Sequence, residues 1–203
     1  GDFTELATSY GFDYDQRDRS FMPTSGSIIG FRQTVPIYAD QSYVANTFTL
    51  SKYISFSENF VIANKYYLSA IDGLNNDDVR LNKRNSLSSK RLRGFQRGKV
   101  GPKDGEDFIG GNFVTTANFT TNVPQILSNI QEVDFVMFLD AANIWGVDYD
   151  SSIDDDGSIR SSVGVGIDWM TPIGPLNFIL AQPITKESSD KIQTFRFNLG
   201  TTF

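Results

Sequence analysis

The chain has 203 residues, with 18 Lys and Arg against 24 Asp and Glu, a net charge of −6, and neither Cys nor His. These counts exclude a disulfide framework, a thiol nucleophile, a Cys or His metal site and a Ser-His-Asp triad, and an acidic chain is not a general nucleic-acid binder. We therefore expect no enzyme activity, no cofactor, no bound metal and no nucleic-acid partner.

Alternation of apolar and polar residues recurs along the chain, and no segment shows a sustained helical stripe. The alternation predicts nine strands, near 3–15, 25–36, 42–57, 59–71, 111–123, 133–145, 159–171, 175–184 and 193–203. Strands of about ten residues suit a tilted membrane crossing. The mean hydropathy of −0.26 agrees with this, because a membrane β-barrel alternates apolar and polar residues and its mean hydropathy is therefore close to zero. A transmembrane helix would need about 18 continuous apolar residues, which the sequence lacks.

The connections between these strands differ in length. Segments 57–59 and 171–174 are tight, whereas 72–110 and 146–158 are long. Short periplasmic turns and long external loops are typical of an outer-membrane barrel. The alternative is a soluble antiparallel barrel, but the second face of many strands is small and polar, which makes a poor packed core. The sequence therefore predicts an all-β, antiparallel transmembrane β-barrel in a single domain.

Positive charge is concentrated in the loop 72–110. Nine of the 18 basic residues lie between Arg80 and Lys103 with no acidic residue among them, which leaves nine basic and 24 acidic residues elsewhere, a charge of −15. The loop could be solvated beside lipid headgroups, could bind nucleic acid, or could fold back into a polar, acidic lumen, as in wide barrels. No aromatic interleaving supports a nucleic-acid patch. Glycines favour the lumenal position, since they permit irregular backbone close to a wall; they are Gly94, Gly98, Gly101, Gly105, Gly110 and Gly111.

A motif in this loop resembles the conserved loop of the outer-membrane-protein assembly barrels. It consists of Leu92-Arg93-Gly94-Phe95, then Gly98-Lys99-Val100-Gly101-Pro102, then Gly110-Gly111-Asn112. In that family the corresponding loop enters the lumen, and its Arg, here Arg93, pairs with an inward-facing Asp of a later strand. The matching residue is Asp140, in a segment 138–145 where Ala142 replaces the usual Gly. The charge distribution and the inward phase of Asp140 agree with this independently.

Three further segments resemble the family in the same order along the chain. Residues 15–18 with 23–26, and residues 171–176, resemble two of its periplasmic turns. Residues 195–203 resemble a terminal β-signal, and the positions that carry this likeness are Phe195, Phe197, Asn198, Leu199, Gly200 and Phe203. The family usually has a Glu where this chain has Thr120. The sequence therefore does not support a second acidic partner for the loop at this position.

The resemblance implies an outer-membrane protein assembly factor of a Gram-negative bacterium. Such a barrel folds β-barrel proteins and inserts them into the outer membrane by pairing their strands with a weakly closed seam between its own first and last strands. Residues 193–203 would form one side of that seam. The implied partners are outer-membrane lipid, unfolded outer-membrane proteins and periplasmic lipoprotein subunits of the assembly complex.

Two other functions stay open. A protein-secretion pore of the two-partner type shares the loop motif, and the number of periplasmic POTRA domains before residue 1 would separate it from an assembly factor. A passive porin-like barrel is the third possibility, and the Arg93 motif argues against it.

The predicted strand count is odd, whereas single-chain bacterial barrels have even numbers of strands. The matched motifs fall in the second half of a family barrel that has sixteen strands. We therefore expect residues 1–203 to be the C-terminal part of such a barrel domain. A small complete barrel of eight or ten strands is the alternative.

An acidic segment superficially resembles a calcium-binding loop. It contains Asp148, Asp150, Asp154, Asp155 and Asp156 before Gly157. The Glu that completes such a loop is absent, so we expect a solvated, acidic external loop.

Overall fold

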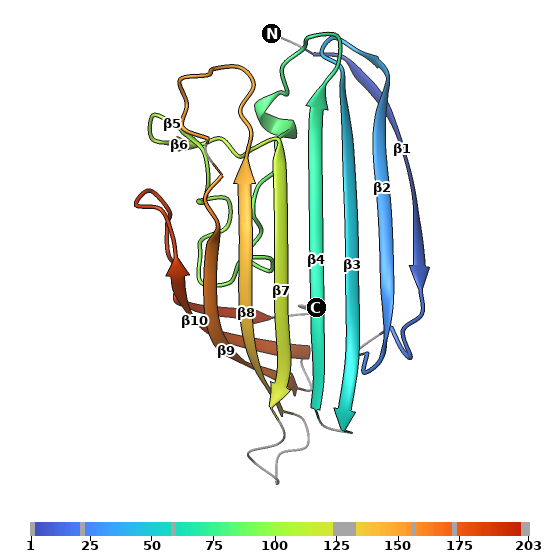
Figure 1. Cartoon of the computed structure of the whole chain (residues 1–203), viewed down its shortest axis with the longest axis vertical. Helices are drawn as coiled ribbons and strands as arrows, with labels where there is room; N and C mark the ends of the chain where they lie inside the picture. The colour runs from blue at the N-terminus through green and yellow to red at the C-terminus, as the bar shows by residue number, and fades with distance from the viewer. Residues whose placement is uncertain are drawn as a thin grey trace.

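The computed structural model describes residues 3–20, 23–57, 60–123, 133–155, 157–171 and 174–199. Nine strands form one antiparallel sheet whose spatial order follows the chain (Figure 1). They are β1 (Glu5–Asp15), β2 (Gly26–Ala39), β3 (Tyr43–Ser57), β4 (Phe60–Gly73), β7 (Phe113–Val123), β8 (Val133–Trp145), β9 (Arg160–Thr171), β10 (Gly174–Thr185) and β11 (Phe195–Leu199). The predicted all-β class and its nine strands are confirmed. In the described part of the chain, no helix is long and apolar enough to cross a membrane.

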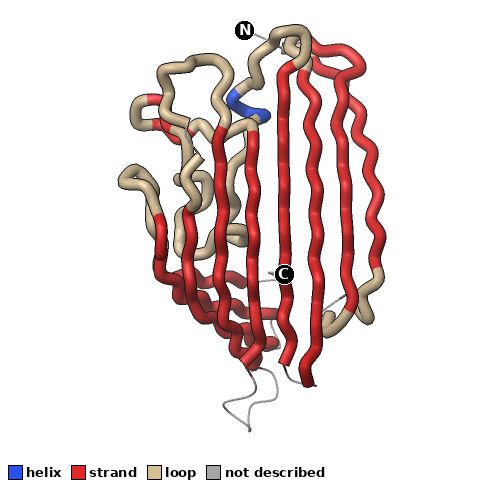
Figure 2. Tube along the Cα trace, viewed as in Figure 1, coloured by secondary structure: helices blue, strands red, loops and turns tan. Residues whose placement is uncertain are grey.

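The loop 72–110 separates β4 from β7. It contains the short strands β5 (Lys103–Asp104) and β6 (Asp107–Phe108), which pair with each other, and a single 3-10 turn, η1 (Leu81–Lys83). Figure 2 shows the nine strands as a curved wall, with loop segments gathered beside its upper part.

Each strand pairs in antiparallel register with its neighbours. The register of β3 and β4 extends from Tyr43 opposite Gly73 to Ser57 opposite Phe60. Among the described residues, β11 pairs with β10 from Phe195 to Leu199. The terminal strand therefore begins two residues later than the predicted 193–203. The reason is that backbone groups at residues 191 and 193 bond to the loop 72–110 instead.

The two faces of the wall differ in burial. In β8, Phe138 and Asp140 are buried, whereas the intervening Met137 and Leu139 are exposed. The exposed face of β8 continues across the next three strands. On it, one exposed apolar residue of each strand stands opposite that of the next: Met137, Val165, Leu180 and Phe195. A contiguous apolar surface is unfavourable in water and suits contact with lipid. We call this side the outer face, and the side that carries Asp140 the inner face.

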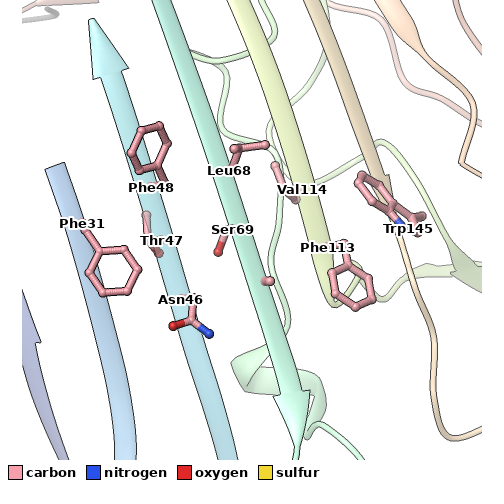
Figure 3. A pocket seen from close by; sticks show the side chains of 10 residues that line it. Phe31, Asn46, Thr47, Phe48, Leu68, Ser69, Phe113, Val114 and Trp145 are labelled. Carbon is pink, nitrogen blue, oxygen red and sulfur yellow. The ribbon is translucent and has the colours of Figure 1, made fainter. Parts of the chain in front are cut away.

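A hollow of about 210 Å³ interrupts the outer face. Figure 3 shows Phe31, Phe48 and Leu68 on one side of it and Phe113 and Trp145 on the other. The rings of Phe113 and Trp145 stack with their centroids 5.7 Å apart. The hollow exists because the small side chain of Ala70 stands in the cross-strand row next to Phe113.

The main apolar core lies between the loop 72–110 and the inner face, not between two sheets. Both sides contribute to it: Leu87, Leu92, Phe95 and Val100 from the loop, and Val114, Ala142 and Ile144 from β7 and β8. Burying a large apolar side chain stabilises a fold by about 1.5–3 kcal/mol. Docking of the loop is therefore a major source of stability for this wall.

Candidate functional site at the loop-to-wall contact

Arg93 reaches from the loop to the inner face and meets Asp140 of β8. Its Nε donates to Asp140 Oδ2 at 2.7 Å and its Nη2 donates to Oδ1 at 2.6 Å, so the guanidinium binds both carboxylate oxygens. The backbone N–H of Arg93 adds a hydrogen bond to Oδ2 at 3.0 Å. Asn118 of β7 donates from Nδ2 to Oδ1 at 2.8 Å. The structure thus brings the two residues together with every carboxylate oxygen bonded.

Other groups hold the Arg93 side chain on both sides. Its guanidinium lies 3.6 Å from the ring centroid of Phe138, a cation–π contact. Its Nη2 also donates to Thr120 Oγ1 at 3.1 Å, so Thr120 supplies a neutral acceptor. The Arg93 carbonyl accepts a hydrogen bond from Ser162 Oγ of β9 at 2.5 Å. One loop residue therefore contacts three neighbouring strands of the wall.

The burial of this ion pair determines its energetic role. The side chains of Arg93 and Asp140 are 7% and 0% exposed. Burial of two charges carries a desolvation cost that close hydrogen bonding offsets, so the net stability of such a pair is small. Removal of one partner leaves the other charge buried and uncompensated, at a cost of about 3–5 kcal/mol. The pair therefore fixes where the loop sits on the wall.

The rest of the motif lies close to the wall. Leu92 and Phe95 fill the core cluster. Gly94 has φ +90°, and a Cβ there would lie 3.2 Å from Ala181 Cβ. Gly101 has φ +100°, and a Cβ there would lie 2.4 Å from Ile144 Cγ2, so only glycine fits. Gly98 faces open space and the next motif residue after Gly101, Pro102, is buried.

A second contact joins Arg84 of the loop to Asp148, in the segment that follows β8. The guanidinium of Arg84 pairs with Asp148 Oδ1, and its side chain is 1% exposed. Oδ2 accepts from the backbone N–H of Val79 at 2.7 Å and from Asn112 Nδ2 at 2.9 Å. Burial alone would raise the pKa of Asp148, but these hydrogen bonds and the charge of Arg84 together lower it.

The acidic segment after β8 is not simply solvated, so the prediction of a solvated external loop is wrong for two of its residues. Asp148 bonds as described above, and Asp155 accepts a hydrogen bond from the backbone N–H of Val147 at 2.6 Å. Asp150 bonds within its own turn to Ser152. In the described residues no group of three or more Asp and Glu side chains could hold a metal ion.

A third contact joins Arg160, the first residue of β9, to Asp190 in the loop between β10 and β11. Their side chains are 5% and 0% exposed, and Arg160 Nε lies 3.0 Å from Asp190 Oδ2. Sequence reasoning missed this pair. The available signal is the inward phase of Arg160, two residues before the buried Ser162, because a charge on an inner face needs a partner.

The residues of the terminal strand alternate as predicted for a wall strand. Phe195, Phe197 and Leu199 are exposed on the outer face. Asn198 points the other way and donates from Nδ2 to Asn177 Oδ1 at 3.1 Å. Gly200 and Phe203, which the sequence also assigns to the seam, lie outside the described residues. The terminal strand and the Arg93 motif are linked through Arg196, whose Nη2 lies 3.4 Å from the Phe95 carbonyl.

Comparison with known proteins finds relatives of this chain. The chain is 27% identical over 202 residues to the outer membrane protein assembly factor BamA of Neorickettsia risticii, covering 97% of the chain and 27% of the relative. It is 30% identical over 139 residues to the BamA of Neisseria meningitidis serogroup B, covering 55% of the chain and 17% of the relative. The crystal structure of Haemophilus ducreyi BamA lacking POTRA domains 1–3 superposes with a TM-score of 0.87 at 28% identity, covering 94% of the chain and 41% of that structure.

The chain thus spans less than half the length of each of these proteins. The family model of the Omp85 superfamily domain matches residues 1–203. With a nine-stranded wall that superposes on a BamA barrel and a family model that extends from its first residue to its last, this chain belongs to the Omp85 superfamily.

Proposed function

We propose that this chain forms the C-terminal wall of an outer-membrane assembly factor, which folds β-barrel proteins and inserts them into the outer membrane of a Gram-negative bacterium. The observation that carries the proposal is the likeness to BamA over 97% of the chain. The apolar outer face supports an integral position in the membrane, with lipid as a direct partner. Unfolded outer-membrane proteins are the proposed substrates, and periplasmic lipoproteins are the proposed companion subunits.

The proposed mechanism requires no bond-making chemistry by the chain. In the described part of the chain, β11 pairs with β10 and with no other strand. A strand edge without a partner presents backbone N–H and C=O groups that a strand of a substrate can bond. We infer that β11 is one side of a lateral seam, and that the loop 72–110 holds the wall in shape while the seam exchanges partners. The names of the relatives do not favour the secretion pore or the passive porin.

Site-specific cross-linking tests this proposal. The 203 residues contain no Cys, so a single cysteine introduced here is unique within them. The intact protein carrying Asn198→Cys is reconstituted in liposomes and mixed with an unfolded outer-membrane protein that has one cysteine in its own terminal strand. We expect a disulfide to the substrate during insertion. Ile37→Cys, at an exposed position near the end of β2 and far along the sheet from β11, is the control and is expected to give none.

The same reaction reports function through the heat-modified gel migration of the substrate. Substrate that folds no faster in these liposomes than in empty ones would reject assembly activity. Equal cross-linking at positions 198 and 37 would reject the seam at β11.

A further inference from the structure

The segment 186–194, here called the final loop, connects β10 to β11 and is held by the carboxylate of Asp190. Oδ2 accepts from Arg160 Nε at 3.0 Å and from the backbone N–H of Glu187 at 2.7 Å. Oδ1 lies 3.5 Å from Arg160 Nη2 and 3.4 Å from the backbone N of Gly101. One buried side chain thus joins the final loop, the start of β9 and the loop 72–110.

Arg160 is held in place on its other side. Its Nη1 donates to the carbonyl of Ser158 at 2.8 Å, and the residue is 4% exposed. Because both charges are buried, the geometry of this pair is strongly constrained: displacement of either residue leaves the other charge without a partner.

Beyond this ion pair, the final loop pairs through its backbone with the segment that follows Arg93. The N–H of Gln193 donates to the Gly94 carbonyl at 2.9 Å, and the N–H of Gln96 donates to the Lys191 carbonyl at 2.9 Å. The N–H of Lys191 donates to the Lys99 carbonyl at 3.0 Å. Phe95 and Ile192 form an antiparallel bridge. Residues 94–99 therefore act as a short additional strand beside the final loop.

This pairing matters because β11 follows the final loop directly. Among the described residues, the register between β11 and β10 runs from Leu180 opposite Phe195 to Leu176 opposite Leu199. β11 begins at Phe195, two residues after Gln193, so its start is set by the contacts of the final loop.

We propose that Arg160 and Asp190 are positioning residues for the terminal strand, which hold the final loop against the loop 72–110 and thereby fix where β11 starts. We call the ion pair of Arg160 and Asp190 the clamp. Its importance for assembly rests on the proposed function, whereas its effect on β11 does not. The clamp thereby couples β11 to the loop 72–110. The start of β11 cannot be displaced without breaking the backbone hydrogen bonds between the final loop and residues 94–99.

Hydrogen exchange of the intact protein in detergent, without substrate, tests the clamp directly. We expect Asp190→Asn to increase exchange in peptides covering 94–99 and β11 by about tenfold or more, because a buried charged hydrogen-bond network is lost. Exchange in β2 and β3 is expected to stay unchanged. Asp148→Asn is the matched control: the same chemical change releases the other end of the loop 72–110, and it is expected to leave β11 protected.

A designed disulfide provides the second variant. Gln96 and Lys191 are exposed and lie opposite each other beside the Phe95–Ile192 bridge. Gln96→Cys with Lys191→Cys, once oxidised, replaces the clamp covalently and is expected to restore the protection of β11 in the Asp190→Asn protein. If Asp190→Asn alone does not fold, folding of the cross-linked triple variant supports the clamp, and its failure to fold overturns the proposal.

The exchange pattern decides between the remaining outcomes. Unchanged exchange of β11 in Asp190→Asn overturns the clamp, and so does equal acceleration in Asp190→Asn and Asp148→Asn. Accelerated exchange of β11 with normal assembly activity keeps the clamp and contradicts only its role in the proposed function.

Discussion

At the scale of single residues, the molecule depends on three arginine–aspartate contacts, two of which are buried on both sides. Arg93 with Asp140 sits at the centre of the loop, Arg84 with Asp148 holds its first part, and Arg160 with Asp190 holds the final loop beside it. Each pair joins segments that are far apart in sequence. Each therefore fixes position more than it adds net stability, since the desolvation cost offsets much of the attraction.

The central pair gives the first prediction. We expect Arg93→Ala to destabilise the barrel by about 3–5 kcal/mol and to reduce assembly activity, because Asp140 is left charged and buried. Arg93→Lys should not rescue it, because an ammonium cannot bind both carboxylate oxygens. Denaturant unfolding and heat-modified gel migration measure the effect, with Arg97→Ala, an exposed residue of the same loop, as the control. Normal migration and full activity of Arg93→Ala would contradict the assigned role.

Two glycines of the same loop give the second prediction. Gly101 and Gly98 both have positive φ, of +100° and +64°, but only at Gly101 does a Cβ meet the wall. We expect Gly98→Ala to cost about 1–2 kcal/mol for the left-handed backbone alone. Gly101→Ala should cost at least about 1–3 kcal/mol more, because its Cβ would overlap Ile144. Denaturant unfolding compares the two variants, and equal destabilisation would show that the contact with Ile144 is unimportant.

At the scale of elements, the strands could be predicted from sequence but the loop contacts could not. Alternation predicts β8 and its inward Asp140 because the side-chain period of a strand is two residues. The motif that contains Arg93 predicts its pairing. In contrast, no local sequence pattern relates Arg160 to Asp190 or predicts that Gln193 bonds to Gly94 instead of to β10. Those contacts depend on how the loop 72–110 folds back.

The contact of the loop with Asp148 gives a prediction for pH. Asp148 has a lowered pKa in the folded protein, so its contribution to stability is fully present above the unfolded value of about 3.9 and is lost as the pH falls through the folded value. The difference in melting temperature between the wild type and Asp148→Asn should therefore be constant near neutral pH and shrink below about pH 4. A difference that does not change between pH 7 and pH 3 would show that the carboxylate charge contributes nothing.

At the scale of the whole molecule, the fold is a wall with one exposed apolar face and one face that is covered by a docked loop. The charges are also unevenly distributed, since residues 80–103 of the loop include nine basic and no acidic residues, and the residues outside 80–103 have a charge of −15. Composition alone shows only the sum of −6. The packing of Leu92 and Phe95 against β7 and β8 explains why a wall with small, polar inward residues still has an apolar core.

A charge placed on the outer face tests its contact with lipid. Leu139 is 44% exposed in the middle of β8, so Leu139→Lys should destabilise the protein in liposomes by about 2–4 kcal/mol, the usual cost near the bilayer midplane. Glu106→Lys, at an exposed side chain of the loop 72–110, is the control and should change the free energy of unfolding by less than about 0.5 kcal/mol. Equal unfolding free energies for the two variants would place Leu139 away from the lipid.

The partners of Arg93 also set an order of events during folding. Asp140, Ser162 and the final loop all come later in the chain than Arg93 itself. When the chain is made from its N-terminus, the loop is therefore complete before β7, β8 and β9, the strands that hold Arg93. The guanidinium of Arg93 stays hydrated until these strands have paired, because only the assembled wall can replace the water around it. Docking of Arg93 therefore follows the pairing of β7, β8 and β9 in the correct register.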